Sequence, residues 1–149
     1  MAEVLFYHLT ETTLDESLPS LLEKSLERGW KAVVQTGSIE RRDELDARLW
    51  TWHEDAFLGH GTTDDPHPQY QPILLTTEQG NANGAQIRFL VDGAEPPPLG
   101  DYQRAVFMFD GHDASHLDQA RAHWKIMKAE GHAVTYWQQT PERRWERKA

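Results

Sequence analysis

The stretch over residues 113–138 constrains the fold most, because it joins a helical pattern, a glycine stop and a strand pattern. Gly131 ends the helical part, since glycine adopts the left-handed turn of a helix C-terminus without a Cβ penalty. The strand pattern follows, with Val134 and Tyr136 on one face. The apolar positions at helical spacing before the stop are Leu117, Ala120, Trp124 and Met127.

The first fifty residues alternate between strand and helix patterns in the same way. Thr13 and Glu16 have the spacing of a capping box, which predicts a helix that begins there and ends near Arg28. Strands are predicted over residues 4–9, 31–36, 73–77, 87–91, 105–109 and 132–138, and a further helix over residues 39–50. This order predicts an α/β fold: a three-layer, Rossmann-like open sheet of roughly five to six strands, mostly parallel, with helices on both faces.

The length of 149 residues predicts one domain over residues 1–149. Its basic C-terminal tail, from about residue 139, is expected to be loosely held, with Trp145 as the residue that could anchor it. Residues 49–60 are aromatic and irregular, and residues 61–71 are expected to form a polar loop.

The chain has no cysteine, so it has neither a disulfide framework nor a thiolate metal site. It shows no cationic, apolar leader at its start and no apolar run of bilayer length. These features indicate a cytoplasmic protein that does not enter a membrane.

Positive charge gathers at one end of an acidic chain. Residues 121–149 hold seven Lys and Arg against three Asp and Glu, whereas the whole chain has a formal net charge of −9. Arg121, Lys125 and Lys128 form a cationic ridge on the predicted helix, beside Trp124. Such a ridge can dock a short acidic, apolar peptide. The other interpretation is that these are solvated cations, favoured by the dipole near a helix C-terminus.

The main alternative function is a nucleotide- or metal-dependent enzyme. The Gly37-Ser38 turn follows a predicted strand, where a nucleotide-binding fold places its phosphate loop, but no GxxxxGK[ST] or GxGxxG motif is present, so no functional P-loop is expected. The histidines that could bind a metal are His112 with His116, and His53, His60 and His67 in the loop-rich middle. Nothing in their spacing makes them converge, and we expect no metal, no cofactor and no catalytic residue.

Direct DNA binding is a third candidate function. The sequence pI of 5.3 argues against it, because phosphate contacts need a basic surface. We therefore expect no direct sequence-specific DNA binding.

Trp50, Trp52 and Phe57 form a dense aromatic group next to the end of the second predicted helix. Such a group either covers the sheet as a small core or anchors a partner protein. We expect it to be at least partly buried, and we keep it as a candidate second partner surface.

Short motifs along almost the whole chain carry a resemblance to one family. They are FYHL at residues 6–9, VVQT at 33–36, ELDARLW at 44–50, FLGH at 57–60, PILL at 72–75 and the run from Ala120 to Trp137. In this order and spacing they resemble the chi subunit family of bacterial DNA polymerase III, the small accessory proteins of the clamp loader.

The resemblance implies a Rossmann-like accessory subunit without catalysis, acting in DNA replication. It implies two partners: the psi subunit of the clamp loader, and the acidic C-terminal tail of single-stranded DNA-binding protein. It places that tail on the last long helix and the final strand, where Arg121, Lys125 and Trp124 match the family's basic and aromatic positions. The residues that contact psi cannot be assigned from the resemblance.

Overall fold

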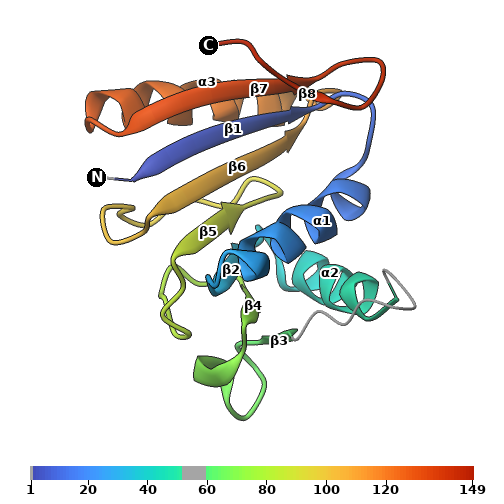
Figure 1. Ribbon diagram of the computed structural model, residues 1–149, viewed down its shortest axis with the longest axis vertical. Helices are drawn as coiled ribbons and strands as arrows, with labels where there is room; N and C mark the ends of the chain where they lie inside the picture. The colour runs from blue at the N-terminus through green and yellow to red at the C-terminus, as the bar shows by residue number, and fades with distance from the viewer. Residues whose placement is uncertain (1, 52–59) are drawn as a thin grey trace.

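The computed structural model describes residues 2–51 and 60–149, the side chains of residues 50 and 51 excepted (Figure 1). The helices are α1 (Leu14–Glu27), α2 (Ile39–Thr51) and α3 (Ala114–Ala129), with a 3-10 turn, η1, at Pro68–Tyr70. The strands are β1 (Glu3–Leu9), β2 (Ala32–Gln35), β3 (His60–Thr62), β4 (Ile73–Thr76), β5 (Ile87–Leu90), β6 (Arg104–Asp110), β7 (Ala133–Gln139) and β8 (Trp145–Arg147). Among these residues, no helix is long and apolar enough to cross a membrane.

The strands form one sheet in the order β3-β4-β2-β5-β6-β1-β7-β8. Neighbouring strands are parallel throughout, except that β8 runs antiparallel to β7. Figure 1 shows α1 and α2 in front of the sheet and α3 behind it. The predicted fold class, a mostly parallel open α/β sheet with helices on both faces, is therefore confirmed.

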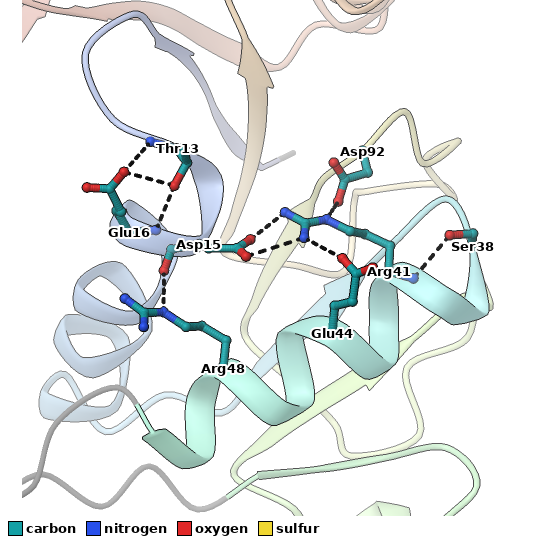
Figure 2. Close-up of polar contacts among 8 residues, drawn as sticks. All are labelled: Thr13, Asp15, Glu16, Ser38, Arg41, Glu44, Arg48 and Asp92. Carbon is teal, nitrogen blue, oxygen red and sulfur yellow. Dashed lines mark hydrogen bonds and ion pairs between the residues drawn. The ribbon is translucent and has the colours of Figure 1, made fainter.

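Local sequence signals start the three helices, and the capping box predicted at Thr13 and Glu16 is present. The Thr13 side chain accepts a hydrogen bond from the Glu16 amide, and the Glu16 side chain accepts one from the Thr13 amide, which completes the capping box (Figure 2). Ser38 Oγ accepts from the Arg41 amide at 3.2 Å and caps α2. Asp113 caps α3 by accepting from the amides of residues 115 and 116. Each cap satisfies amides that have no partner inside the helix.

Alternation along the central strands divides the core into two layers. In β1, Leu5 and Leu9 face the front layer with α1 and α2, whereas Val4 and Phe6 face the rear layer with α3. This is the period-two pattern of a strand covered on both sides. The apolar stripe predicted on α3 lies in the rear layer: Leu117, Ala120, Trp124 and Met127.

The structure adds two short strands to those predicted. Residues 61–71 were expected to be a loop, but β3 and η1 lie within or beside this stretch. Both β3 and β8 have three residues, too few for alternation to be recognised in a sequence.

The C-terminal tail meets the sheet at β7. Gln139 is buried at the end of β7, and β8 pairs with that strand. Trp145 contacts Tyr7 of β1 with ring centroids 4.5 Å apart. This aromatic contact and the strand pairing are the contacts through which the polar, basic segment meets the sheet.

Candidate partner-binding site

A groove of about 450 Å³ runs along one flank of α3, over the carboxyl-terminal part of the sheet. Helix α3 supplies one wall, and β1, β6 and β7 supply the floor. Its lining residues are His8, Phe109, Leu117, Ala120, Arg121, Trp124, Lys125, Tyr136 and Ala149. We call this the cationic groove, because its rim carries Arg121 and Lys125.

The two rim cations are available to a ligand. The Arg121 side chain is 74% exposed, and its ion pair in the described part of the chain is a 3.4 Å contact with Asp118, which is 78% exposed. An exposed pair of this kind is weak and is screened by salt, so it is easily exchanged for a ligand carboxylate. Lys125, one helical turn further on, is also exposed.

Trp124 is fixed in the wall between these cations. Its ring meets Phe6 edge-to-face at 5.5 Å and Tyr136 edge-to-face at 5.9 Å. The Lys128 ammonium lies 5.0 Å from the centroid of the Trp124 ring. Lys128 does not line the groove, but its cation–π contact helps to hold the ring that does.

The floor contains a hydrogen-bonded pair from two adjacent strands. The Tyr136 hydroxyl and His8 Nδ1 lie 2.8 Å apart, and the His8 ring stacks on Phe109 with centroids 5.1 Å apart. Gly111 makes room for this arrangement, because a Cβ there would lie 2.2 Å from His8 Nε2. The pair is therefore held from below by close packing and offers polar atoms inside an otherwise apolar groove.

Burial shifts the titration of both members of this pair. Desolvation lowers the pKa of His8 from its ordinary 6.5, and the nearby His112 lowers it further, while Asp110 opposes the shift. Desolvation raises the pKa of Tyr136, and the positive charge of Arg121 offsets part of that rise. At neutral pH the floor is thus uncharged and the rim is positive.

The turn that a nucleotide-binding fold would use has a different role here. Arg41 of α2 donates to Asp15 of α1, to Asp92 at 2.7 Å and to Glu44 at 3.0 Å (Figure 2). A Cβ on Gly37 would lie 2.4 Å from the Asp92 carbonyl oxygen, so the turn is filled by protein backbone. The contacts at this turn join α1, α2 and the end of β5.

Of the histidines named as metal candidates, those within the described residues are not gathered into a metal site. Among residues 2–51 and 60–149, no group of three or more His, Cys, Asp or Glu could hold a metal ion. His112 contacts the Thr10 carbonyl oxygen at 3.0 Å, and His60 contacts the Asp46 carboxylate at 3.2 Å. His53 lies outside the described residues.

The sequence-predicted site residues fall into two groups. Arg121, Trp124 and Lys125 are brought together in the cationic groove. Trp52 and Phe57 lie outside the described residues, as does the side chain of Trp50, and the second candidate surface stays a prediction.

Sequence reasoning missed the floor residues His8, Phe109 and Tyr136. Alternation in residues 132–138 places Val134 and Tyr136 on one face of the strand, and the structure shows that α3 packs on this face. Bringing Tyr136 beside His8 depends on β1 and β7 being neighbours, and β1 is separated from β7 by more than a hundred residues.

Two comparisons with known proteins bear on identity. The family described as DNA polymerase III chi subunit, HolC, matches residues 1–135. A protein of Rickettsia prowazekii (strain Madrid E), named "Probable DNA polymerase III subunit chi", is 30% identical over 91 residues. That alignment covers 61% of this chain and 55% of the Rickettsia protein, so the chain spans about half the length of this relative.

The family match covers β1 through the first residues of β7, including all of α3, so it contains most of the cationic groove. The chain belongs to the DNA polymerase III chi subunit family.

Proposed function

We propose that this chain is a non-catalytic accessory subunit in bacterial DNA replication. In this proposal it binds the acidic C-terminal tail of single-stranded DNA-binding protein in the cationic groove. Through a second surface it joins the clamp loader by way of the psi subunit or its equivalent. Membership of the chi family supports the setting in replication.

The observation that carries the proposal is the chemistry of the cationic groove. Its interior is apolar and aromatic, and its rim holds two exposed cations on an otherwise acidic protein. A peptide tail with upstream aspartates and an apolar final residue matches both parts. Arg121 is suited to the terminal carboxylate, because its planar guanidinium can donate to both oxygens.

Lys125 would act on the upstream carboxylates as a less directional charge. Trp124 would form the apolar wall, since its ring is already fixed by Phe6 and Tyr136. The contact is small, so an affinity on the order of micromolar is expected. Several tails on one DNA-binding protein would raise the effective affinity by avidity.

The second half of the proposal concerns the psi subunit. The aromatic group of Trp50, Trp52 and Phe57 is the surface that we propose for this partner. We propose that both partners bind the chain at once. Copurification with psi from cells that contain both proteins tests this half, with Trp52→Ala as the variant expected to lose psi and keep the tail.

Peptide titration tests the tail-binding half. We expect a fluorescent peptide with the acidic tail sequence to bind the wild type and to bind more weakly as salt is added. Arg121→Ala should cost about 1.5–3 kcal/mol of binding, the range for a hydrogen bond to a charged group. The unfolding midpoint should hardly change, because Arg121 is exposed.

Arg144→Ala is the matched control, since it removes an exposed arginine outside the cationic groove. Equal affinity of the wild type and Arg121→Ala, or affinity indifferent to salt, would remove this groove from the proposed function. If Arg144→Ala weakened binding as much as Arg121→Ala does, the affinity would depend on the overall charge of the protein and not on this groove.

A further inference from the structure

A second groove, of about 630 Å³, lies on the opposite flank of α3 from the cationic groove. Its walls are Ile126 and Met127 of α3 and the proline segment, residues 96–98, that leads to Leu99. Two carboxylates, Glu95 and Glu130, also line it. We call it the acidic groove, because none of the described residues that line it is Lys or Arg.

The apolar part of the acidic groove is open to solvent at one helix position. Ile126 is 48% exposed, although the solvent side of a helix ordinarily carries polar residues. Across from it, Pro97 and Leu99 are buried, and consecutive prolines limit how far this wall can move. An exposed isoleucine beside a stiff apolar wall provides a preformed niche for one apolar side chain.

The carboxylates of the acidic groove lie beside two histidines whose side chains are largely covered. Glu95 lies 3.5 Å from Nε2 of His123, and Glu130 lies 3.3 Å from Nε2 of His132. The histidine side chains are 8% and 7% exposed, whereas the carboxylate side chains are 71% and 51% exposed. Each carboxylate therefore has half or more of its side chain open to solvent and a histidine on its protein side.

We propose that the acidic groove binds an extended protein segment in which Lys or Arg residues flank an apolar residue. The apolar side chain would insert between Ile126 and the proline segment, and the flanking cations would meet Glu95 and Glu130. Charge complementarity selects this occupant over an acidic peptide or a nucleic acid, because both of those carry the sign of the rim.

The two grooves of α3 thus select opposite charges on the two flanks of one helix. The residues that line the cationic groove and those that line the acidic groove do not overlap. The inference does not depend on the proposed function, and a ligand in one groove leaves the other accessible.

The test uses the full chain and a designed peptide of about ten residues, with two leucines between pairs of lysine and arginine. A second peptide has glutamates in place of the cations. We expect the basic peptide to bind, to weaken with added salt, and to shift the NMR signal of the Ile126 δ1 methyl group. The acidic peptide should leave that methyl signal unchanged.

Two variants locate the site. Ile126→Ser should weaken the basic peptide about tenfold, because it removes the apolar contact at the centre without adding a charge. Glu95→Lys combined with Glu130→Lys should weaken it by about tenfold or more, since both rim charges are reversed. Glu40→Lys combined with Glu142→Lys is the matched control, because it makes the same charge change at exposed positions elsewhere and should retain most of the binding.

The inference would be overturned if the control pair, Glu40→Lys with Glu142→Lys, lost as much binding of the basic peptide as the pair Glu95→Lys with Glu130→Lys. General attraction between a basic peptide and an acidic protein would then explain the binding. Absence of binding would also overturn the inference, as would methyl shifts confined to other parts of the protein. Arg121→Ala should leave the basic peptide unaffected, and a loss in that variant would assign the peptide to the cationic groove instead.

Discussion

The rear face of the sheet is covered in two different ways, and the contrast explains where the two proposed grooves lie. Over β6, β1 and β7 the cover is α3, which packs through an apolar stripe. Over β2, β4 and β5 the cover is irregular chain, residues 77–86 and 91–103, which contributes Ala85, Leu99 and Tyr102. A cylindrical helix leaves two flanks open above a sheet, and both proposed grooves lie there.

The irregular half is organised by a buried cation. The Arg88 side chain is fully buried and donates to Gln35 Oε1 at 2.6 Å, to the carbonyl oxygens of Glu78 and Gly80, and to the Tyr102 hydroxyl. Burial lowers the pKa of Arg88, which reflects the cost of removing its charge from water. Irregular chain has backbone carbonyls to satisfy, and one guanidinium satisfies several of them.

The helix-covered half should be the more sensitive to loss of apolar volume. Phe6 is fully buried and stacks on Phe107 with centroids 4.6 Å apart, besides its contact with Trp124. We expect Phe6→Ala to lower the free energy of unfolding by about 3–5 kcal/mol, measured by urea denaturation. Phe6→Leu keeps most of the side-chain volume, so it should lower the free energy of unfolding by less. It should also weaken binding of the acidic peptide, because Trp124 loses its contact with the Phe6 ring. A cost for Phe6→Ala below that of Phe6→Leu would contradict the packing described here.

The part of the rear layer formed by residues 77–86 and 91–103 should lose stability when polar contacts are removed. Arg88→Met retains the length of the side chain but leaves buried acceptors without a donor, which should cost about 1–3 kcal/mol. Limited proteolysis should then cut within residues 77–103 sooner than in the wild type, while affinity for the acidic peptide is unchanged. Protection of this segment equal to that of the wild type would show that Arg88 does not organise it.

Sequence patterns could predict the helix-covered half better than the irregular one. The stripe on α3 and the alternation of β7 are local, and each element was placed to within a residue or two. Arg88 lies within IRFL, a run that indicates a buried strand, but its neutral partners come from three separate segments. No local sequence pattern indicates that distant segments meet at one side chain. For the same reason the sequence did not predict the His8–Tyr136 pair on the groove floor.

Close packing beneath that pair can be tested at Gly111. A Cβ at this position would meet His8 Nε2 at 2.2 Å and the Leu9 carbonyl oxygen at 2.9 Å. Gly111→Ala should therefore displace the His8 ring and cost about 1–3 kcal/mol, the range for overpacking. Affinity for the acidic peptide should also fall, because His8 forms part of the groove floor. Gly80→Ala is the control, because nothing lies within 4 Å of a Cβ there.

The smallest expected effect is a pH dependence that arises at His8, on the floor of the cationic groove. Because the pKa of His8 is lowered by burial and by His112, the unfolded chain binds a proton at this residue more readily than the folded protein does. The contribution of His8 to stability is therefore lost as pH falls below the ordinary value of 6.5, until pH reaches the lowered pKa. An acidic peptide in the cationic groove should raise the pKa of His8, since nearby carboxylates favour the charged ring.

Linkage then requires the acidic peptide to bind more tightly as pH falls through this range. An NMR titration of the His8 ring without the peptide measures the lowering of its pKa, and the same titration with the acidic peptide measures the expected rise. His8→Gln should remove this part of the pH dependence while Arg121 and Lys125 still supply attraction. A His8 pKa that stays the same when peptide is bound would place the ligand away from the groove floor and confine the contact to the rim.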